Sequence, residues 1–357
     1  MSRAATALRW GIVGPGGIAR DFAASLARHE AGRVVGVCSR SAERAAAFTA
    51  EYGGRPTADL EDLLRTPGLD AVYVATPHAF HRVVAERLLQ EGVPVLCEKP
   101  MCTTAADTRW LIGVAGMTAT PLLEGWMYRT HPQWSRLTDL ISGGGLGRVR
   151  RIIARFGFLA NQNPASRLFD PALGGGAILD IGGYPVSAAL GVAAASTGRT
   201  VDQLEPAIAG GGSLTATGVD ADAIASIEFA GDIRAAVATS ITRDLGMHLE
   251  VQGEEATAIL PTPFLPGGRR DGTRATVLIR DAAGREHAET LEATVDCHAA
   301  EALVMGELVR GGLHASPPPA MVDHAGSIAI ASLLEAWRGL LPGGGTFGAS
   351  QSSGGGK

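Results

Sequence analysis

Residues 8–19 read LRWGIVGPGGIA, and this stretch decides the fold. Leu8 to Val13 form a short apolar run that predicts a buried strand, and Ile18 to Ala27 have the spacing of a helix. Between them stands the pattern G-x-G-x-x-A, made by Gly14, Gly16, Gly17, Ile18 and Ala19 around Pro15. Its first glycine permits a tight turn, its second lets the backbone approach a pyrophosphate, and its small last residue lets helix and strand pack closely. The stretch therefore predicts a dinucleotide-binding loop.

Short apolar runs and helical stretches keep alternating as far as residue 126. The runs predict strands at residues 34–38, 71–75, 93–97 and 121–124, with helices at 42–52, 60–64, 81–90 and 104–113. Continuous apolar strands between amphipathic helices are typical of a parallel sheet that is covered on both faces. With right-handed crossovers, this gives a doubly wound Rossmann domain over residues 1–126.

After residue 127 the pattern changes to consecutive strands joined by short turns. We expect strands at residues 148–158, 204–214, 223–229, 233–241, 248–251, 256–260 and 275–279, and helices at 179–190, 299–309 and 322–337. Short turns between neighbouring strands favour an antiparallel sheet. The sequence thus predicts a second, α+β domain over residues 127–340 with a large, mainly antiparallel open sheet. The Gly- and Ser-rich residues 341–357 are expected to form a flexible tail.

Composition excludes several classes of protein. The 357 residues carry a formal net charge of −5, which gives no reason to expect a nucleic-acid partner. We find no apolar run of membrane-spanning length and no signal-peptide core, so we expect a cytoplasmic protein without a membrane partner. The four cysteines (Cys38, Cys97, Cys102 and Cys297) show no zinc-ligand spacing and are expected to be reduced thiols, with no metal site.

The end of the second strand chooses between the two nicotinamide dinucleotides. An acidic residue there would bind the 2′-hydroxyl of the adenine ribose. This chain instead has Ser39 and Arg40, with Arg44 one helical turn further on. A hydroxyl and guanidinium groups suit a 2′-phosphate, so we expect NADP(H) as the cofactor, with NAD(H) possible. The alternative is that the two arginines are solvated charges at the start of a helix.

The third strand ends in Thr76 and Pro77, followed by His78 and His81. Because ligands bind outside the carboxyl ends of strands in such sheets, Thr76 and Pro77 should line the nicotinamide half of the cleft. The two histidines lie nearby, so either could contact the cofactor or be catalytic. Either could instead be a structural histidine at the start of a helix.

Two charged residues, Glu98 and Lys99, end the next strand and should face the same cleft. A surface lysine in a loop is the alternative. Further on, the glycine-rich stretch 174–184 contains Asp180 and Tyr184, whose i, i+4 spacing places them on one helix face. This pair could be a structural hydrogen bond, or it could complete a site with Lys99.

Four stretches together resemble the Gfo/Idh/MocA oxidoreductase family over roughly residues 7 to 340. They are residues 14–19, 98–100 (EKP), 124–132 (EGWMYRTHP) and 174–184. The segments ALRWGIV, TPHAFH and LCEKP are most similar to the branch that contains the dihydrodiol and NADP-dependent D-xylose dehydrogenases. The resemblance implies hydride transfer between nicotinamide and a hydroxyl or keto carbon of a sugar, sugar derivative or polyol, in a homo-oligomer (dimer or tetramer).

The same resemblance implies residue roles. Catalysis falls to Lys99, Asp180 and Tyr184, and the expected substrate contacts are Lys99, Trp126, Tyr128, Arg129, Asp180 and Tyr184. The dihydrodiol branch carries Trp-Thr-Arg where this chain has Met127-Tyr128-Arg129, a departure that favours a sugar over an aromatic diol. The particular sugar, the oxidised carbon, the direction, and the choice of Lys99 or Tyr184 as proton carrier stay open.

Two other functions fit the same fold. One is a regulator that senses a dinucleotide without turnover, although such a protein has no need of Lys99, Asp180 and Tyr184. The other is a redox-assisted glycosidase or lyase with a tightly bound cofactor, which the NADP-like Ser39 and Arg40 disfavour.

Overall fold

The strand that precedes the glycine-rich loop, β1 (Leu8–Val13), lies inside a six-stranded parallel sheet. The computed structural model describes residues 7–161, 163–311 and 321–342. In this part of the chain the sheet has the order β3-β2-β1-β4-β5-β6, with β2 (Gly32–Cys38), β3 (Arg55–Thr57), β4 (Ala71–Val74), β5 (Val95–Glu98) and β6 (Leu122–Gly125). The order reverses direction between β1 and β4, which is where such sheets bind ligands.

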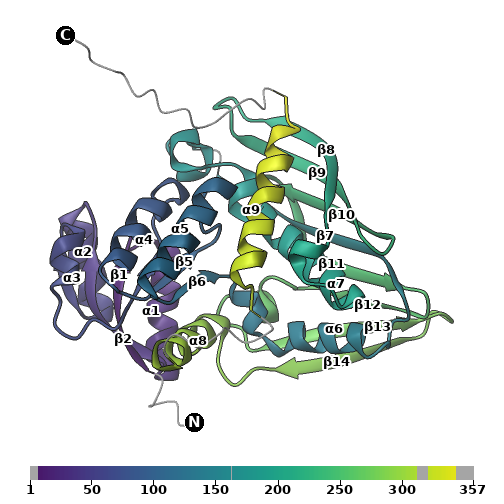
Figure 1. The fold of residues 1–357 in the computed structure, drawn as a ribbon, viewed down its shortest axis with the longest axis horizontal. Helices are drawn as coiled ribbons and strands as arrows, with labels where there is room; N and C mark the ends of the chain where they lie inside the picture. Colours follow the sequence, from purple (N-terminus) through teal and green to yellow (C-terminus); the bar gives the residue numbers. More distant parts are fainter. Residues whose placement is uncertain (1–6, 162, 312–320, 343–357) are drawn as a thin grey trace.

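Helices cover both faces of this sheet (Figure 1). They are α1 (Gly17–His29), α2 (Ala42–Tyr52), α3 (Leu60–Leu64), α4 (His81–Gln90) and α5 (Ala105–Thr118). Strand β4 shows why both faces are filled, since its side chains point to opposite sides in turn. Tyr73 packs with Phe22 of α1 in one apolar cluster, whereas Val72 and Val74 pack with Leu88 of α4 in another.

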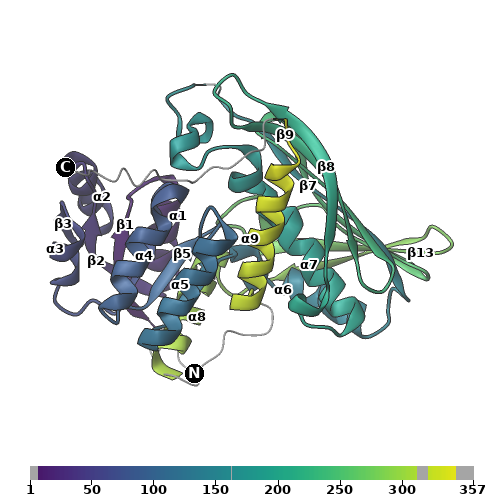
Figure 2. The same ribbon diagram turned by 45° about the horizontal axis from the view of Figure 1, so that its top comes forward.

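The second sheet has eight strands in the order β14-β13-β12-β11-β7-β10-β9-β8. Their bounds are β7 (Val149–Leu159), β8 (Ala207–Leu214), β9 (Asp220–Phe229), β10 (Ile233–Ser240), β11 (Thr242–Gly253), β12 (Ala256–Leu260), β13 (Arg274–Asp281) and β14 (Glu286–Glu292). All neighbours pair antiparallel except β7 and β10. Helices α6 (Pro132–Ser142), α7 (Gly183–Thr197) and α9 (His324–Gly339) pack on one face of this curved sheet (Figure 2).

The predicted fold class is confirmed, because one sheet is parallel and the other mainly antiparallel. The sequence missed β3, β14 and α6. Strand β14 has the sequence EHAETLE and is mostly exposed, so it lacks the apolar run that marks a strand. Helix α6 begins with Pro132 at its first position, where proline is tolerated.

Helix α8 (Cys297–Gly311) returns to the first sheet, although its residues fall inside the second predicted domain. Ala302 and Met305 are fully buried in the cluster that contains Trp10 and Phe22. Figure 1 shows α8 beside α1, with which it shares this apolar cluster. We therefore keep the boundary near residue 126 as a proposal and assign α8 to the first domain. Of the predicted tail, residues 343–357 lie outside the described residues.

One helical segment does reach the length of a membrane span, which corrects the expectation from sequence. The 27-residue segment Pro171–Thr197 joins a 3₁₀ turn, the π turn Ile178–Gly182 and α7, and its most apolar window has a mean hydropathy of 1.4. However, 89% of that window is buried inside the protein. The central helix of a globular protein has the same length and hydropathy, because a helix that is apolar on all sides can be buried by surrounding protein as well as by lipid.

Strand β9 allows a matched test of which face of the second sheet holds the core. Ile227 is fully buried, whereas Ile224 on the opposite face is 62% exposed. We expect Ile227→Ala to lower the free energy of unfolding by about 2–5 kcal/mol, because it removes buried methyl groups and leaves a cavity. Ile224→Ala should change it by less than about 1 kcal/mol. Thermal and denaturant unfolding of both variants would measure this, and equal losses would contradict the assignment of faces.

Candidate active site

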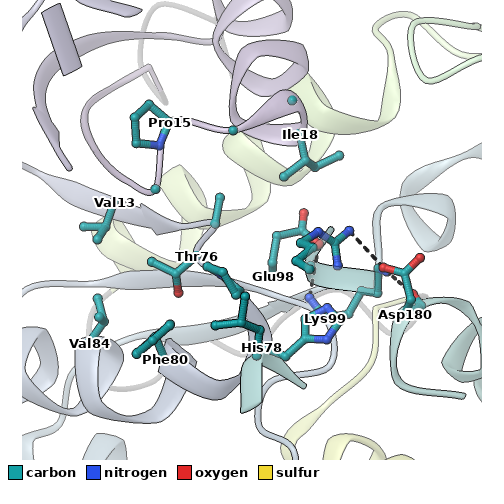
Figure 3. A pocket seen from close by; sticks show the side chains of 18 of the residues that line it. Val13, Pro15, Ile18, Thr76, His78, Phe80, Val84, Glu98, Lys99 and Asp180 are labelled. Atoms are coloured by element: carbon teal, nitrogen blue, oxygen red, sulfur yellow. Dashed lines mark hydrogen bonds and ion pairs between the residues drawn. The ribbon is translucent and has the colours of Figure 1, made fainter. Parts of the chain in front are cut away.

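A cavity of about 1070 Å³ opens at the carboxyl ends of the parallel strands and is closed by residues of the second sheet and its helices. Figure 3 shows its wall from close by. The sequence-predicted residues that line it are Gly14, Gly16, Gly17, Ile18, Ser39, Arg40, Arg44, Thr76, Pro77, His78, Glu98, Lys99, Asp180 and Tyr184. Residues that lie far apart in the chain thus share one cavity.

The glycine-rich loop has the geometry of a phosphate cradle. Gly14 has φ +88°, and a Cβ atom there would lie 2.7 Å from the carbonyl oxygen of Ala75. Gly16 is the N-cap of α1 and offers no side chain to cap the first turn, which also contains no acidic residue. A Cβ atom at Gly17 would meet nothing within 4 Å. The free N–H groups at this helix end therefore face open space that a pyrophosphate fits.

Ala19 is the one motif residue that does not line the cavity. It is fully buried in the cluster beneath α1. Its role is the close packing of helix and strand, as the motif predicts, and not contact with a ligand.

Ser39, Arg40 and Arg44, from the end of β2 and the start of α2, also line the cavity. The guanidinium of Arg40 lies 5.0 Å from the ring centroid of Phe80, a cation–π contact that orients it. Asp59 also lines the cavity, but its carboxylate accepts a hydrogen bond of 2.7 Å from the Asp62 N–H and caps α3. The Ser39 hydroxyl and the two guanidinium groups are therefore side chains of this region that can contact a phosphate.

One corner of the cavity, formed by Lys99, Asp180 and Tyr184, joins the two halves of the chain. Lys99 follows β5, and its Nζ donates a hydrogen bond to the main-chain oxygen of Asp180. The same Nζ lies 4.9 Å from the ring centroid of Tyr184. Asp180 belongs to a π-helical turn, Ile178–Gly182, which leads directly into α7. Such turns disturb the regular hydrogen-bond ladder and are frequent at functional sites.

Charges at this corner are buried but paired. The Asp180 carboxylate lies 2.9 Å from the Arg167 guanidinium. Burial alone would raise the pKa of Asp180, but the charges of Lys99 and Arg167 outweigh it and lower that pKa. Burial lowers the pKa of Lys99, in spite of the opposing charges of Asp180 and Glu98. Burial likewise raises the pKa of the Tyr184 hydroxyl well above 10. At neutral pH the tyrosine is therefore a proton donor.

The two predicted histidines separate in the structure. His78 lines the cavity, and its Nδ1–H donates to the carbonyl oxygen of Gly174 at 2.9 Å. His81 does not line the cavity, and each of its ring nitrogens lies 2.9 Å from a backbone oxygen, of Pro100 and of Thr76. His81 therefore ties two strand-end loops together, which corrects its prediction as a cofactor contact. One of these loops contains the Lys99–Pro100 peptide bond, which is cis.

The predicted substrate contacts Trp126, Tyr128 and Arg129 do not line the cavity. Trp126 packs edge-on against Tyr184, with ring centroids 5.5 Å apart. The Tyr128 hydroxyl lies 2.8 Å from the Ser187 hydroxyl of α7, and Arg129 donates to the carbonyl oxygen of Ser187 at 2.9 Å. These residues support α7 from behind and correct the sequence-based assignment.

The structure adds cavity residues that the sequence did not reveal. They are chiefly Met127, Phe156, Phe158, Arg167, Leu168, Leu173, Leu265 and Arg270. Phe156 and Phe158 stand two apart on β7, so their alternation placed them on one face of a strand. Arg167 and Arg270 lie outside the strands and α-helices, where no periodicity marks a direction. Among the described residues, no group of three or more His, Cys, Asp and Glu side chains gathers to hold a metal ion.

Comparison with known proteins extends these observations. Residues 8–120 match "Oxidoreductase family, NAD-binding Rossmann fold", and residues 134–259 match the GFO/IDH/MocA C-terminal domain. The chain is 33% identical to an uncharacterised oxidoreductase of Rhizobium meliloti, covering 72% of this chain and 76% of that protein. It is 29% identical to trans-1,2-dihydrobenzene-1,2-diol dehydrogenase of Mus musculus, covering 92% and 95%. A 3-ketoreductase from Actinomadura kijaniata, crystallised with NADP and TDP-benzene, superposes with a TM-score of 0.79 at 25% identity, covering 94% and 98%.

Burial of His78 makes a prediction about acid stability. Burial first, and the His81 ring next, lower the pKa of His78 to about 3, below the 6.5 of an unfolded histidine. Between these values the unfolded chain binds the extra proton, so His78 stabilises the fold above pH 6.5 and that contribution is lost as pH falls toward 3. His78→Asn, which keeps a donor near the Nδ1 position, should make the melting temperature fall less steeply between pH 6.5 and 4. An identical pH dependence in both proteins would contradict this.

Proposed function

Because the chain belongs to the Gfo/Idh/MocA oxidoreductase family, we propose that it transfers a hydride between NADP(H) and a hydroxyl or keto carbon of a sugar, sugar derivative or polyol. Its class is established by that membership: it is an NAD(P)-binding oxidoreductase, as the sequence predicted. One observation carries the proposal. Lys99 from the dinucleotide-binding sheet meets Asp180 and Tyr184 from the second domain in the cavity that the glycine loop also lines.

NADP(H) is proposed over NAD(H) for two reasons. Arg40 and Arg44 line the cavity, and the Asp59 carboxylate, which also lines it, is already used as a helix cap. The structurally similar 3-ketoreductase was crystallised with NADP. Guanidinium groups recognise phosphate through charge-assisted hydrogen bonds, whereas a ribose diol would leave them unpaired.

When bound, the nicotinamide ring supplies the carbon that accepts or donates the hydride. The side chains of the corner handle the proton. Lys99 has a lowered pKa and Tyr184 a raised one, so Lys99 is the better matched of the two to take the hydroxyl proton near neutral pH. Tyr184 remains protonated and can donate a hydrogen bond to the same substrate oxygen. Asp180 keeps Lys99 in place through its carbonyl and compensates part of its charge through its carboxylate.

A second candidate substrate is a trans-diol on an apolar ring. Five apolar side chains line the second-domain side of the cavity: Phe156, Phe158, Leu168, Leu173 and Leu265. The sequence argument for a sugar depended on the stretch Met127-Tyr128-Arg129, of which Met127 lines this cavity and Tyr128 and Arg129 do not. Several relatives are named trans-1,2-dihydrobenzene-1,2-diol dehydrogenase, after a substrate of this kind. Aldoses, inositols, keto-sugars and a dihydrodiol should therefore be tested together.

We propose a homo-oligomer in the cytoplasm, as expected from the sequence. Support for association comes from large apolar side chains on the second sheet, since Ile224 on β9 is 62% exposed and Leu214 on β8 is 41% exposed.

Turnover on this substrate panel tests the function, with Lys99→Met as the diagnostic variant. We expect NADP⁺-dependent oxidation of at least one panel member, and a loss of roughly 10²–10⁴-fold in kcat for Lys99→Met, because proton transfer and substrate orientation both depend on the amine. NADPH affinity, followed by fluorescence, should stay within about threefold. Turnover retained in the variant would overturn the role of Lys99.

The panel also separates the alternative functions. Tight cofactor binding with no turnover would favour a sensing regulator. Bond cleavage with a copurified cofactor that is recycled would favour a redox-assisted glycosidase.

Arg40→Ala tests the cofactor preference. Loss of a charge-assisted contact of about 1.5–3 kcal/mol should weaken NADPH binding roughly 10–100-fold. NADH binding should change by no more than about twofold, since that cofactor lacks the 2′-phosphate. Arg33→Ala, at an exposed position of β2 that does not line the cavity, is the matched control. Unchanged NADPH binding in Arg40→Ala would show that the arginine is only a solvated charge.

A further inference from the structure

A buried ion pair lies behind the catalytic corner and takes no part in the mechanism above. His298 and Glu301 stand three residues apart on α8, and their side chains are 2% and 0% exposed. The Nδ1 atom of His298 lies 3.6 Å from the Glu301 carboxylate, beyond hydrogen-bond distance. Neither ring nitrogen and neither carboxylate oxygen has a hydrogen-bond partner among the described residues. Four such buried atoms are rare in folded proteins, and ordered internal water is their usual partner.

Ring contacts and one hydrogen bond lead from the pair to the active-site cavity by way of α1, β4 and β5. Phe22 of α1 stacks on Tyr73 with centroids 4.2 Å apart and meets His298 edge-on at 6.3 Å. The Tyr73 hydroxyl donates to the carboxylate of Glu98, which lines the cavity next to Lys99. The charged and titratable groups that act on the pair are Glu98 from β5, Asp296 before α8, Tyr73 from β4, Cys297 of α8 and Tyr184 of α7.

On its other side the pair reaches a second cavity of about 360 Å³. This cavity is lined by His298 and Asp296 together with Asp21, Ala24, Arg28, Arg269, Arg270 and Asp271. Arg270 lines both cavities and lies 2.6 Å from Asp21, so the two cavities lie on either side of one side chain. Asp296 holds Arg28 at 2.8 Å and His29 at 3.1 Å. His298 of the buried pair therefore lines a charged cavity that shares Arg270 with the active-site cavity.

We propose that His298 and Glu301, with internal water, form a proton store that takes up the proton of the reaction and passes it to the second cavity. The proposal rests on the proposed function and adds positioning residues to it. Oxidation of the substrate gives a carbonyl product, a reduced nicotinamide and one proton. Hydride transfer removes the positive charge of the nicotinamide ring, and in a buried site a proton gained nearby compensates that loss of charge. The proton leaves the Lys99 amine, and the pair returns it to solvent through the second cavity.

The direction of the titration agrees with this role. Burial raises the pKa of Glu301 to about 7, with the charges of Glu98 and Asp296 adding to that rise and His298 opposing it. The pair therefore exchanges its second proton near neutral pH. The oxidised nicotinamide ring carries a positive charge that the reduced ring lacks, whereas both cofactor forms carry the same phosphates. That positive charge disfavours the second proton of the pair, so binding of NADP⁺ should release more protons than binding of NADPH. The affinity for NADP⁺ relative to NADPH should accordingly rise with pH through about 7.

Calorimetry of cofactor binding tests the proposal without any substrate. NADP⁺ is titrated into the full-length protein at pH 7 in phosphate and in Tris, whose ionisation enthalpies differ, and the difference in heat gives the number of protons released. We expect a release of roughly 0.2–0.5 proton by the wild-type protein, and a loss of most of that release in Glu301→Gln. Glu307→Gln, an exposed glutamate on the same helix, is the matched control and should behave as the wild type.

Equal proton release by the wild type and Glu301→Gln would overturn the proposal, even if the enzyme turns over its substrate normally. If Glu301→Gln does not fold, the same titration of His298→Asn replaces it. A high-resolution structure of the wild type with no water within hydrogen-bond distance of Glu301 would also overturn it. Conversely, protein that shows the linked release but oxidises nothing in the substrate panel would leave the proton store standing and remove the proposed substrate class.

Discussion

The buried amine of Lys99, which is a cation whenever it is protonated, is the constraint on which the site depends. A lone cation held away from water is very unfavourable, so it requires compensation from several sides. The dinucleotide-binding sheet supplies the lysine at the end of β5 but little to neutralise it beyond Glu98. The second domain supplies the Asp180 carbonyl, the Asp180 carboxylate and the face of the Tyr184 ring. The two halves of the chain are therefore joined by the electrostatics of one side chain as well as by apolar packing.

That requirement explains the unusual backbone on the second-domain side. Asp180 contributes both its carbonyl and its carboxylate, and the π turn that contains it places the two toward Lys99 and Arg167. The turn is itself fixed from behind, because the buried Asp220 carboxylate accepts the N–H of Ile178. A side chain at Gly176, which has φ +109°, would collide with that carboxylate. The glycines of this stretch thus serve the placement of Asp180 and Tyr184.

The parts of the site that lie in regular secondary structure or in a glycine-rich turn could be predicted from the sequence. The glycine loop, the ends of β4 and β5, and the Asp180–Tyr184 pair are marked by turns, apolar runs and helical spacing, and the structure brings all of them to one cavity. It failed for Trp126, Tyr128 and Arg129 because a short 3₁₀ turn, Met127–Thr130, points them toward α7 and leaves Met127 facing the cavity. It could not find Arg167 or Arg270, since the direction of a side chain in an irregular loop depends on tertiary contacts. The role of His81 could not be predicted for the same reason. No local sequence pattern distinguishes a histidine that contacts a cofactor from one that hydrogen-bonds two backbone loops.

The return of α8 to the first sheet has a consequence for how this protein can change. A dinucleotide-binding half cut after β6 would lack Ala302 and Met305, and would leave Trp10 and Phe22 without their covering helix. The nucleotide-binding half is therefore discontinuous in the chain, and it cannot be exchanged between proteins as a single N-terminal piece. Recombination within this architecture has to carry the helix along with the loop it supports, so new substrate specificities are more accessible through the cavity wall at Phe156, Phe158 and Leu265 than through replacement of a whole half.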